Sequence, residues 1–144
     1  MKTINKDMQV LLAIALFVTA SLNVLAQENS GKDPMQEFFF PPEFVMRYQN
    51  EIQLKKEQKE MIISTVEEAQ KKFTRLQWDL QAEITVLQKL LSESTVNETN
   101  VLVQLDKVLD QERLIKKAQI TLMTRIKNSL TDEQKAKLSA FKGK

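Results

Sequence analysis

The chain has 144 residues, a formal net charge of +2, two glycines, three prolines, and no cysteine or histidine. The lack of cysteine and histidine excludes disulfides, thiol nucleophiles, imidazole bases and the usual ligands of zinc, nickel and copper. Acidic and basic residues alternate, so the basic field that nucleic-acid binding requires is absent. Prevalent Leu, Ile, Gln, Lys and Glu predict an all-α protein.

Residues 1–26 have the pattern of a signal peptide. Two lysines precede an apolar run from Val10 to Ala20, and Val24-Leu25-Ala26 supplies small residues for cleavage before Gln27. An uncleaved membrane anchor is the alternative, because the whole apolar stretch approaches the minimum span of about 17 residues. The pattern predicts export, most simply to a bacterial periplasm.

Residues 27–39 are predicted to be a flexible tether, because the segment is polar up to Gln36. Aromatic residues follow, and Pro42 suits the first turn of a short helix from Glu43 to about Asn50. These rings either pack back over the main helices or stay exposed as an interaction surface. The candidate surface residues of this segment are Phe39, Phe40, Phe44, Met46 and Tyr48.

A long amphipathic helix is predicted from near Leu54 to Leu91. Its apolar residues recur every three or four positions, which places them on one helix face; they are Ile62, Val66, Ala69, Phe73, Leu76, Leu80, Ile84, Leu87 and Leu91. A second set of residues widens this face beyond what one partner helix needs. We expect that second set at a dimer interface or on a client-binding surface; it comprises Met61, Trp78, Ala82, Val86 and Leu90.

A short turn, Ser92 to Asn97, separates this helix from a second long one, with Asn97 as the predicted N-cap. The turn is too short for any arrangement but an antiparallel hairpin. The predicted buried stripe of the second helix comprises Val101, Leu102, Leu105, Val108, Leu109, Ile115, Ala118, Leu122, Ile126 and Leu130.

A third helix is predicted from Thr131 to about Phe141, because Thr131 and Gln134 have the spacing of a capping box. An earlier segment, Leu54 to Lys59, partly repeats Leu130 to Lys135, with Lys55 in the place of threonine. The two copies flank the hairpin, and their motif residues are Leu54, Gln58, Leu130, Thr131 and Gln134.

A Leu-Thr-x-x-Gln motif used twice around a hairpin resembles the Spy/CpxP family of periplasmic chaperones and the related periplasmic heavy-metal sensor and zinc-resistance-associated proteins. The resemblance covers about residues 40–142, and further stretches carry it, among them Phe40 to Met46, Leu76-Gln77-Trp78 and Gln104 to Leu109. It implies a cradle-like antiparallel dimer of hairpins. It also implies binding of unfolding proteins without ATP or, in the sensor branch, metal binding with signalling to a membrane partner.

The leading hypothesis for residues 40–144 is therefore a helical-hairpin chaperone or envelope-stress accessory protein whose partners are unfolded or stress-damaged periplasmic proteins and a second copy of the chain. The alternative is a metal-resistance or metal-sensing module, which would have to use Asp106, Asp110, Glu112 or methionines, since histidine is absent. The third hypothesis is a plain helical scaffold. An enzyme is the weakest hypothesis, because no convergent catalytic residues or phosphate-binding loop are found, and no cofactor is predicted.

Overall fold

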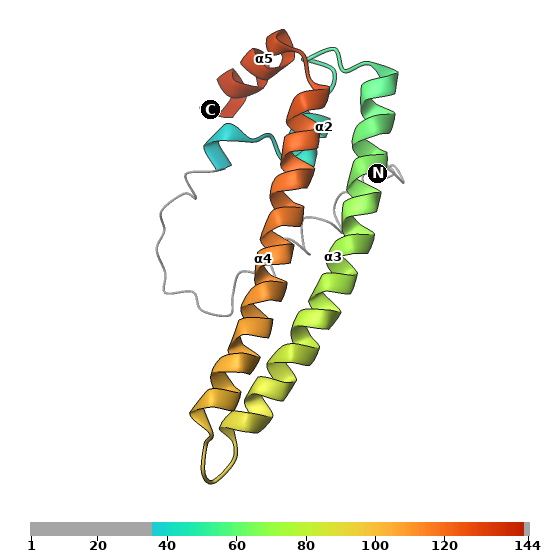
Figure 1. The fold of residues 1–144 in the computed structure, drawn as a ribbon. Helices are drawn as coiled ribbons and strands as arrows, with labels where there is room; N and C mark the ends of the chain where they lie inside the picture. The colour runs from blue at the N-terminus through green and yellow to red at the C-terminus, as the bar shows by residue number, and fades with distance from the viewer. Residues whose placement is uncertain (1–35, 143–144) are drawn as a thin grey trace, which may run out of the picture. The chain divides into compact units, whose positions relative to one another are not determined.

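The computed structural model describes residues 36–142, and within that range all regular secondary structure is helical. A short 3₁₀ helix η1 (Gln36–Phe38) is followed by α2 (Pro42–Arg47), α3 (Lys56–Leu91), α4 (Glu98–Ser129) and α5 (Asp132–Lys142). The fold class is thus as predicted, two long packed helices with short flanking ones (Figure 1). The predicted signal peptide, residues 1–26, and most of the predicted tether lie outside the described residues. No helix between residues 36 and 142 is long and apolar enough to cross a membrane.

The chain divides into two compact units, and both long helices contribute to each. The terminal unit comprises the described residues up to Thr65 and those from Met123 onward, and the hairpin unit comprises Val66–Leu122. The terminal unit therefore joins residues far apart in the sequence, whereas the hairpin unit is continuous.

In the hairpin unit α3 and α4 run side by side in opposite directions (Figure 1). Leu76, Ile115 and Ala118 form its buried core, with Phe73 and Leu80 packed against them. These five residues confirm the central part of the predicted apolar stripes. Leu91, which the prediction also assigned to the α3 stripe, is 53% exposed at the end of the helix.

A polar contact crosses the hairpin near its turn. The buried side-chain amide of Gln104 donates to the Glu83 backbone carbonyl at 2.9 Å and to the Glu83 carboxylate at 2.6 Å. A buried amide needs such partners, because leaving it unpaired costs about 1–3 kcal/mol. The contact therefore fixes the register of α4 against α3 near the turn.

The turn between the helices ends at the predicted N-cap. The Asn97 side-chain oxygen accepts from the Asn100 backbone N–H at 3.0 Å. Replacing Asn97→Ala should lower the free energy of unfolding by about 1 kcal/mol, because that amide loses its acceptor. Thermal unfolding measures the effect. Asn128→Ala, an exposed substitution inside α4, is the control and should be neutral or slightly stabilising; an equal loss in both variants would contradict the cap.

The terminal unit has its own apolar core, built from α2, the start of α3, the end of α4 and α5. Its most deeply buried side chains are Val45, Ile52, Ile62, Ile126 and Leu138. Pro42 lies in the first turn of α2, as predicted. The helix ends at Arg47, three residues before the predicted boundary.

The start of α3 also differs from the prediction, which placed it near Leu54. The backbone at Gln53 has φ 52°, in the left-handed region that a continuous right-handed helix excludes. The Leu54 N–H donates to the Gln49 carbonyl at 2.8 Å. The chain therefore forms a separate turn before α3, and α3 begins at Lys56.

The end of the predicted tether is bound to α5. The Lys142 ammonium donates to the Glu37 carbonyl at 2.9 Å and also to the Phe39 carbonyl, and it lies 4.6 Å from the Phe40 ring centroid. Burial lowers the pKa of Lys142 below its usual value. Lys142 thus holds residues 37–39 against the terminal unit, and the flexibility predicted for residues 27–39 stays a prediction.

The prediction of an exposed aromatic surface is also partly wrong. Phe40 and Met46 are only 4% and 7% exposed, because both fill the core of the terminal unit. Phe39, Phe44 and Tyr48 are half-buried. The Tyr48 ring stacks on Phe141 at 4.4 Å between centroids, with 7° between the ring planes. The alternative prediction, that the rings pack back onto the helices, describes this segment better.

Candidate functional site

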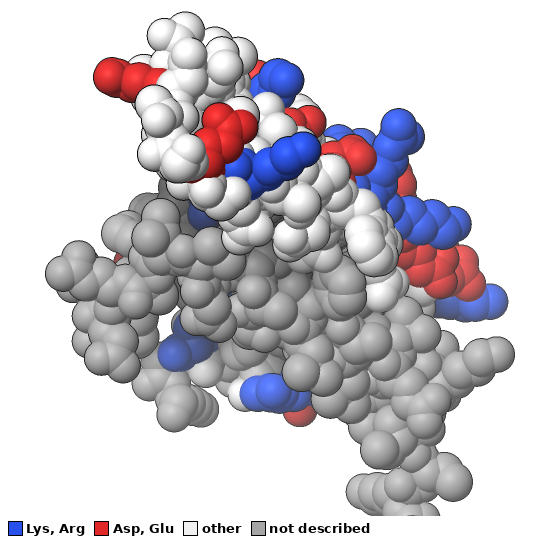
Figure 2. Space-filling view, turned by 90° about the horizontal axis from the view of Figure 1, so that it is seen from below, with Lys and Arg blue, Asp and Glu red and all other residues white. Residues whose placement is uncertain are grey.

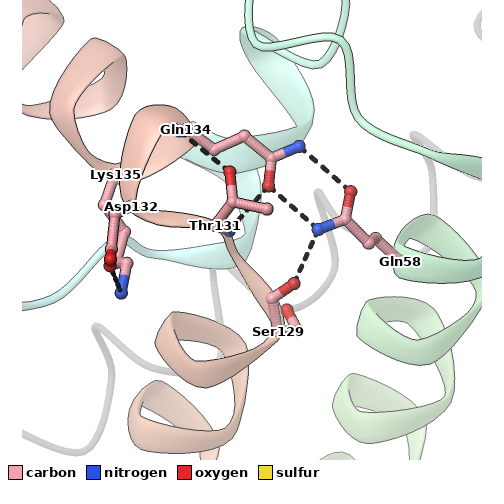
Figure 3. Close-up of polar contacts among 6 residues, drawn as sticks. All are labelled: Gln58, Ser129, Thr131, Asp132, Gln134 and Lys135. Carbon is pink, nitrogen blue, oxygen red and sulfur yellow. Dashed lines mark hydrogen bonds and ion pairs between the residues drawn. The ribbon is translucent and has the colours of Figure 1, made fainter.

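The two Leu-x-x-x-Gln motif copies meet in the terminal unit through their glutamines (Figure 3). The Gln58 amide nitrogen donates to the Gln134 side-chain oxygen at 2.9 Å, and the Gln134 nitrogen donates back to the Gln58 oxygen at 3.0 Å. The Gln58 nitrogen also donates to the Ser129 carbonyl at 2.7 Å, and the Gln134 nitrogen to the Ile52 carbonyl at 3.3 Å. We call Gln58 and Gln134 the glutamine pair.

Each glutamine also caps the helix that carries it. The Gln134 side-chain oxygen accepts from the Thr131 N–H at 2.9 Å, and the Thr131 hydroxyl accepts from the Gln134 N–H at 3.2 Å, which confirms the predicted capping box. The Gln58 oxygen accepts from the Lys55 N–H at 3.0 Å. Lys55 has no side-chain oxygen, so only half of the box exists in the first copy.

The glutamine pair satisfies every donor and acceptor of both amides. Each side-chain oxygen accepts two hydrogen bonds and each nitrogen donates two, which exhausts the capacity of a primary amide. Both groups are neutral and carry no labile proton near neutral pH. The arrangement therefore joins α3, α4 and α5 and has no means of acid–base or nucleophilic chemistry.

Charged residues at the start of α5 support this junction from outside. The Lys135 ammonium lies 2.6 Å from the Asp132 carboxylate, and the hydrogen bond and positive charge of Lys135 lower the pKa of Asp132. The pKa of Glu133 is lowered in the same way by Lys137. Both carboxylates also lie at the positive end of the helix dipole, and these exposed pairs are ordinary helix-stabilising contacts.

Most of the α3 residues that were predicted to lie beside the main apolar stripe are exposed. Trp78 is 72% exposed, and Ala82 and Val86 are exposed as well, whereas Leu90 is half-buried. These four lie in the hairpin unit. Met61 is 55% exposed and lies in the terminal unit.

A second exposed apolar surface, on α4, was missed. Leu102, Val103, Leu109 and Leu114 are each 41–55% exposed, and we call them the α4 ridge. The sequence placed Leu102 and Leu109 in the buried stripe, which is wrong, because the face of α4 that meets α3 carries Gln104, Val108 and Ile115 instead. No sequence signal marked this choice, because the inward face carries the amides Gln104 and Gln111, seven residues apart, and apolar spacing alone would place such residues outside.

Charges of both signs separate the apolar residues of the α4 ridge. Asp106, Lys107, Asp110 and Arg113 are exposed on the same side of α4, and Arg113 pairs with Asp110 at 2.8 Å. Seen from the end of the hairpin turn, the visible described surface likewise shows scattered charges of both signs among uncharged side chains (Figure 2). The ridge is therefore neither a closed apolar seam nor a field of one sign.

No metal site is assembled in the described part of the chain. Between residues 36 and 142, no group of three or more carboxylates converges on one point. Of the three acidic residues weighed for metal binding, Asp106, Asp110 and Glu112 are all exposed on α4.

The comparisons with known proteins add no family assignment. No family model, no curated protein and no solved structure matches this chain.

Proposed function

We propose that this chain is an exported, ATP-independent chaperone that holds partly unfolded proteins on the exposed apolar surface of its hairpin unit. The observation that carries the proposal is the α4 ridge: four large apolar side chains stay about half exposed on one helix and are interspersed with charges of both signs. Large apolar side chains gathered on one exposed face are typical of a surface that binds other proteins.

The chemistry of the ridge suits reversible and unspecific holding. Apolar contact has no directional requirement, so many sequences satisfy it. Exposed charges of both signs attract opposite charges on a client at modest energy, because solvent screens them. Release then needs no nucleotide, since no single contact is strong.

The proposed location and partners rest on sequence patterns. The signal-peptide pattern of residues 1–26 supports a periplasmic protein, and the resemblance of the two motif copies to Spy/CpxP proteins supports a homodimer, with a membrane-bound sensor as a further partner. Light scattering of the protein that begins at Gln27 should give twice the chain mass; a monomer at high concentration would contradict the dimer.

An aggregation assay tests the client-holding activity. The purified protein at several-fold excess should suppress the aggregation of a chemically unfolded client in the absence of ATP. Leu102→Ser combined with Leu109→Ser should reduce suppression several-fold while the thermal midpoint stays nearly unchanged, because both side chains are already half exposed.

The matched control replaces two exposed polar residues of α3, Gln81→Ser with Gln88→Ser, which introduces the same serines without removing apolar surface. This variant should hold clients as the native protein does. Absence of suppression by the native protein would overturn the proposed function. Undiminished suppression by the leucine variant would overturn only the assignment to the α4 ridge.

The metal-sensing alternative gains no support from the described residues, since they bring no carboxylate cluster together. We therefore propose no metal ligand and no catalytic residue.

A further inference from the structure

The half of the hairpin unit that includes the turn buries very little of its side-chain surface. We call residues 77–114 the turn-side arm; it begins just beyond the core layer of Leu76 and Ile115 and contains about four helical turns of each long helix (Figure 1). Among its residues, all of which the structure describes, only Gln104 and Val108 are buried. Val108 is therefore the single buried apolar side chain of the arm.

Exposed apolar side chains are concentrated in the same segment. Of the ten large apolar side chains that are exposed between residues 36 and 142, eight lie in the turn-side arm, and the four residues of the α4 ridge are among them. Apart from Val108, every buried apolar side chain of the described residues lies outside the arm. The arm thus has many large apolar residues but almost no core.

This lack of burial leaves the two helices of the arm weakly held. In water an isolated helix of about 12–15 residues is marginal, and packing of an apolar face supplies most of the stability of a helix in a protein. Each helical part of the arm is close to that length. Half-buried residues such as Ile84 and Leu105 add only part of the stabilisation that full burial would give.

Polar groups between the two helices add little to the closed state. The Gln104 amide bonds to Glu83, but water can satisfy both groups when the helices separate, so the net gain from closure is small. The buried side-chain oxygen of Gln111 accepts no hydrogen bond from any described residue. Separation of the helices lets water reach that oxygen, which removes the cost of leaving it unpaired.

We propose that the turn-side arm opens on its own: its two helices separate and fray from the turn back to the layer of Leu76 and Ile115, while the terminal unit stays folded. The free energy of such a local opening depends on the burial that it disrupts, and here that burial is small. Opening exposes the half-buried apolar residues Ile84, Leu87, Val101 and Leu105, which adds apolar surface to that of the α4 ridge. This opening is a property of the chain alone and does not depend on the proposed function.

Amide hydrogen exchange of the native protein, followed by mass spectrometry of its peptides, tests the proposal. We expect the protection of residues 84–91 and 102–107 to be lower than that of residues 123–129 on the order of a hundredfold, because only the first two segments lie in the arm. Client protein is absent from this experiment, so its outcome is independent of the aggregation assay.

Val108→Ala should speed exchange in both arm segments about fivefold to tenfold and leave residues 123–129 unchanged. Val108 is 6% exposed, so the substitution removes two buried methyl groups, and the higher helix propensity of alanine offsets part of that loss. The matched control is Val103→Ala, the same change on the same helix at a side chain that is 55% exposed. It should leave exchange unchanged or slightly slower.

Three outcomes would overturn the proposal. Equal protection of the arm and of residues 123–129 would show that the chain opens as one unit, and so would an equal acceleration of both by Val108→Ala. Protection of the arm that rises with protein concentration would show instead that a second copy of the chain covers it.

Discussion

Replacing Gln134→Ala should lower the free energy of unfolding by about 3 kcal/mol and the thermal midpoint by about 10 °C. The substitution removes the two amide contacts to Gln58, the bond to the Ile52 carbonyl and the acceptor of the Thr131 N–H. The four lost hydrogen bonds, at somewhat under about 1 kcal/mol each, together account for this loss. Chemical denaturation followed by circular dichroism measures the effect.

Gln88→Ala is the control for this substitution, because Gln88 is an exposed glutamine on α3. It should change stability by no more than about 0.5 kcal/mol. A double-mutant cycle with Gln58→Ala should show coupling of about 1–2 kcal/mol, since the two amides bond directly to each other. Additive losses would show that the glutamine pair does not exist in solution.

Replacing Ile62→Ala should cost a similar amount, about 3 kcal/mol. Ile62 is 0% exposed in the core of the terminal unit, so the substitution removes buried apolar surface and leaves a cavity. The midpoint of denaturant unfolding should fall while its slope stays constant.

Met61→Ala is the matched control, one position earlier on the same helix. Met61 is 55% exposed, so its truncation should cost less than about 1 kcal/mol. Equal losses at the two positions would mean that Met61 is buried by a partner in solution. That result would support a dimer whose interface includes Met61.

The elements of this fold were predictable because each has a local signal. Three- and four-residue spacing of apolar residues predicts long helices, and Asn97 and the Thr131–Gln134 box mark two helix starts through contacts within a single turn. The start of α3 was misplaced by two residues, because the left-handed backbone at Gln53 is one residue's conformation and leaves no periodic pattern.

The candidate site was predicted only in part. The exposure of Trp78 follows from its position two residues from the core stripe. Leu102 and Leu109 were assigned to the wrong face, because leucines occur on several sides of α4 and periodicity alone does not choose among them. The contact between Gln104 and Glu83 decides which face turns inward.

The sequence by itself determined the helices, their caps and the antiparallel hairpin, since each depends on residues close together in the chain. Only the tertiary structure decided that Gln58 and Gln134, which are 76 residues apart, bond to each other. It also decided that Phe40 and Met46 are core residues and that Leu102 and Leu109 are surface. The physical reason is the same in each case: side-chain burial and long-range hydrogen bonds depend on which helix faces meet, and that choice is made by the whole packed chain.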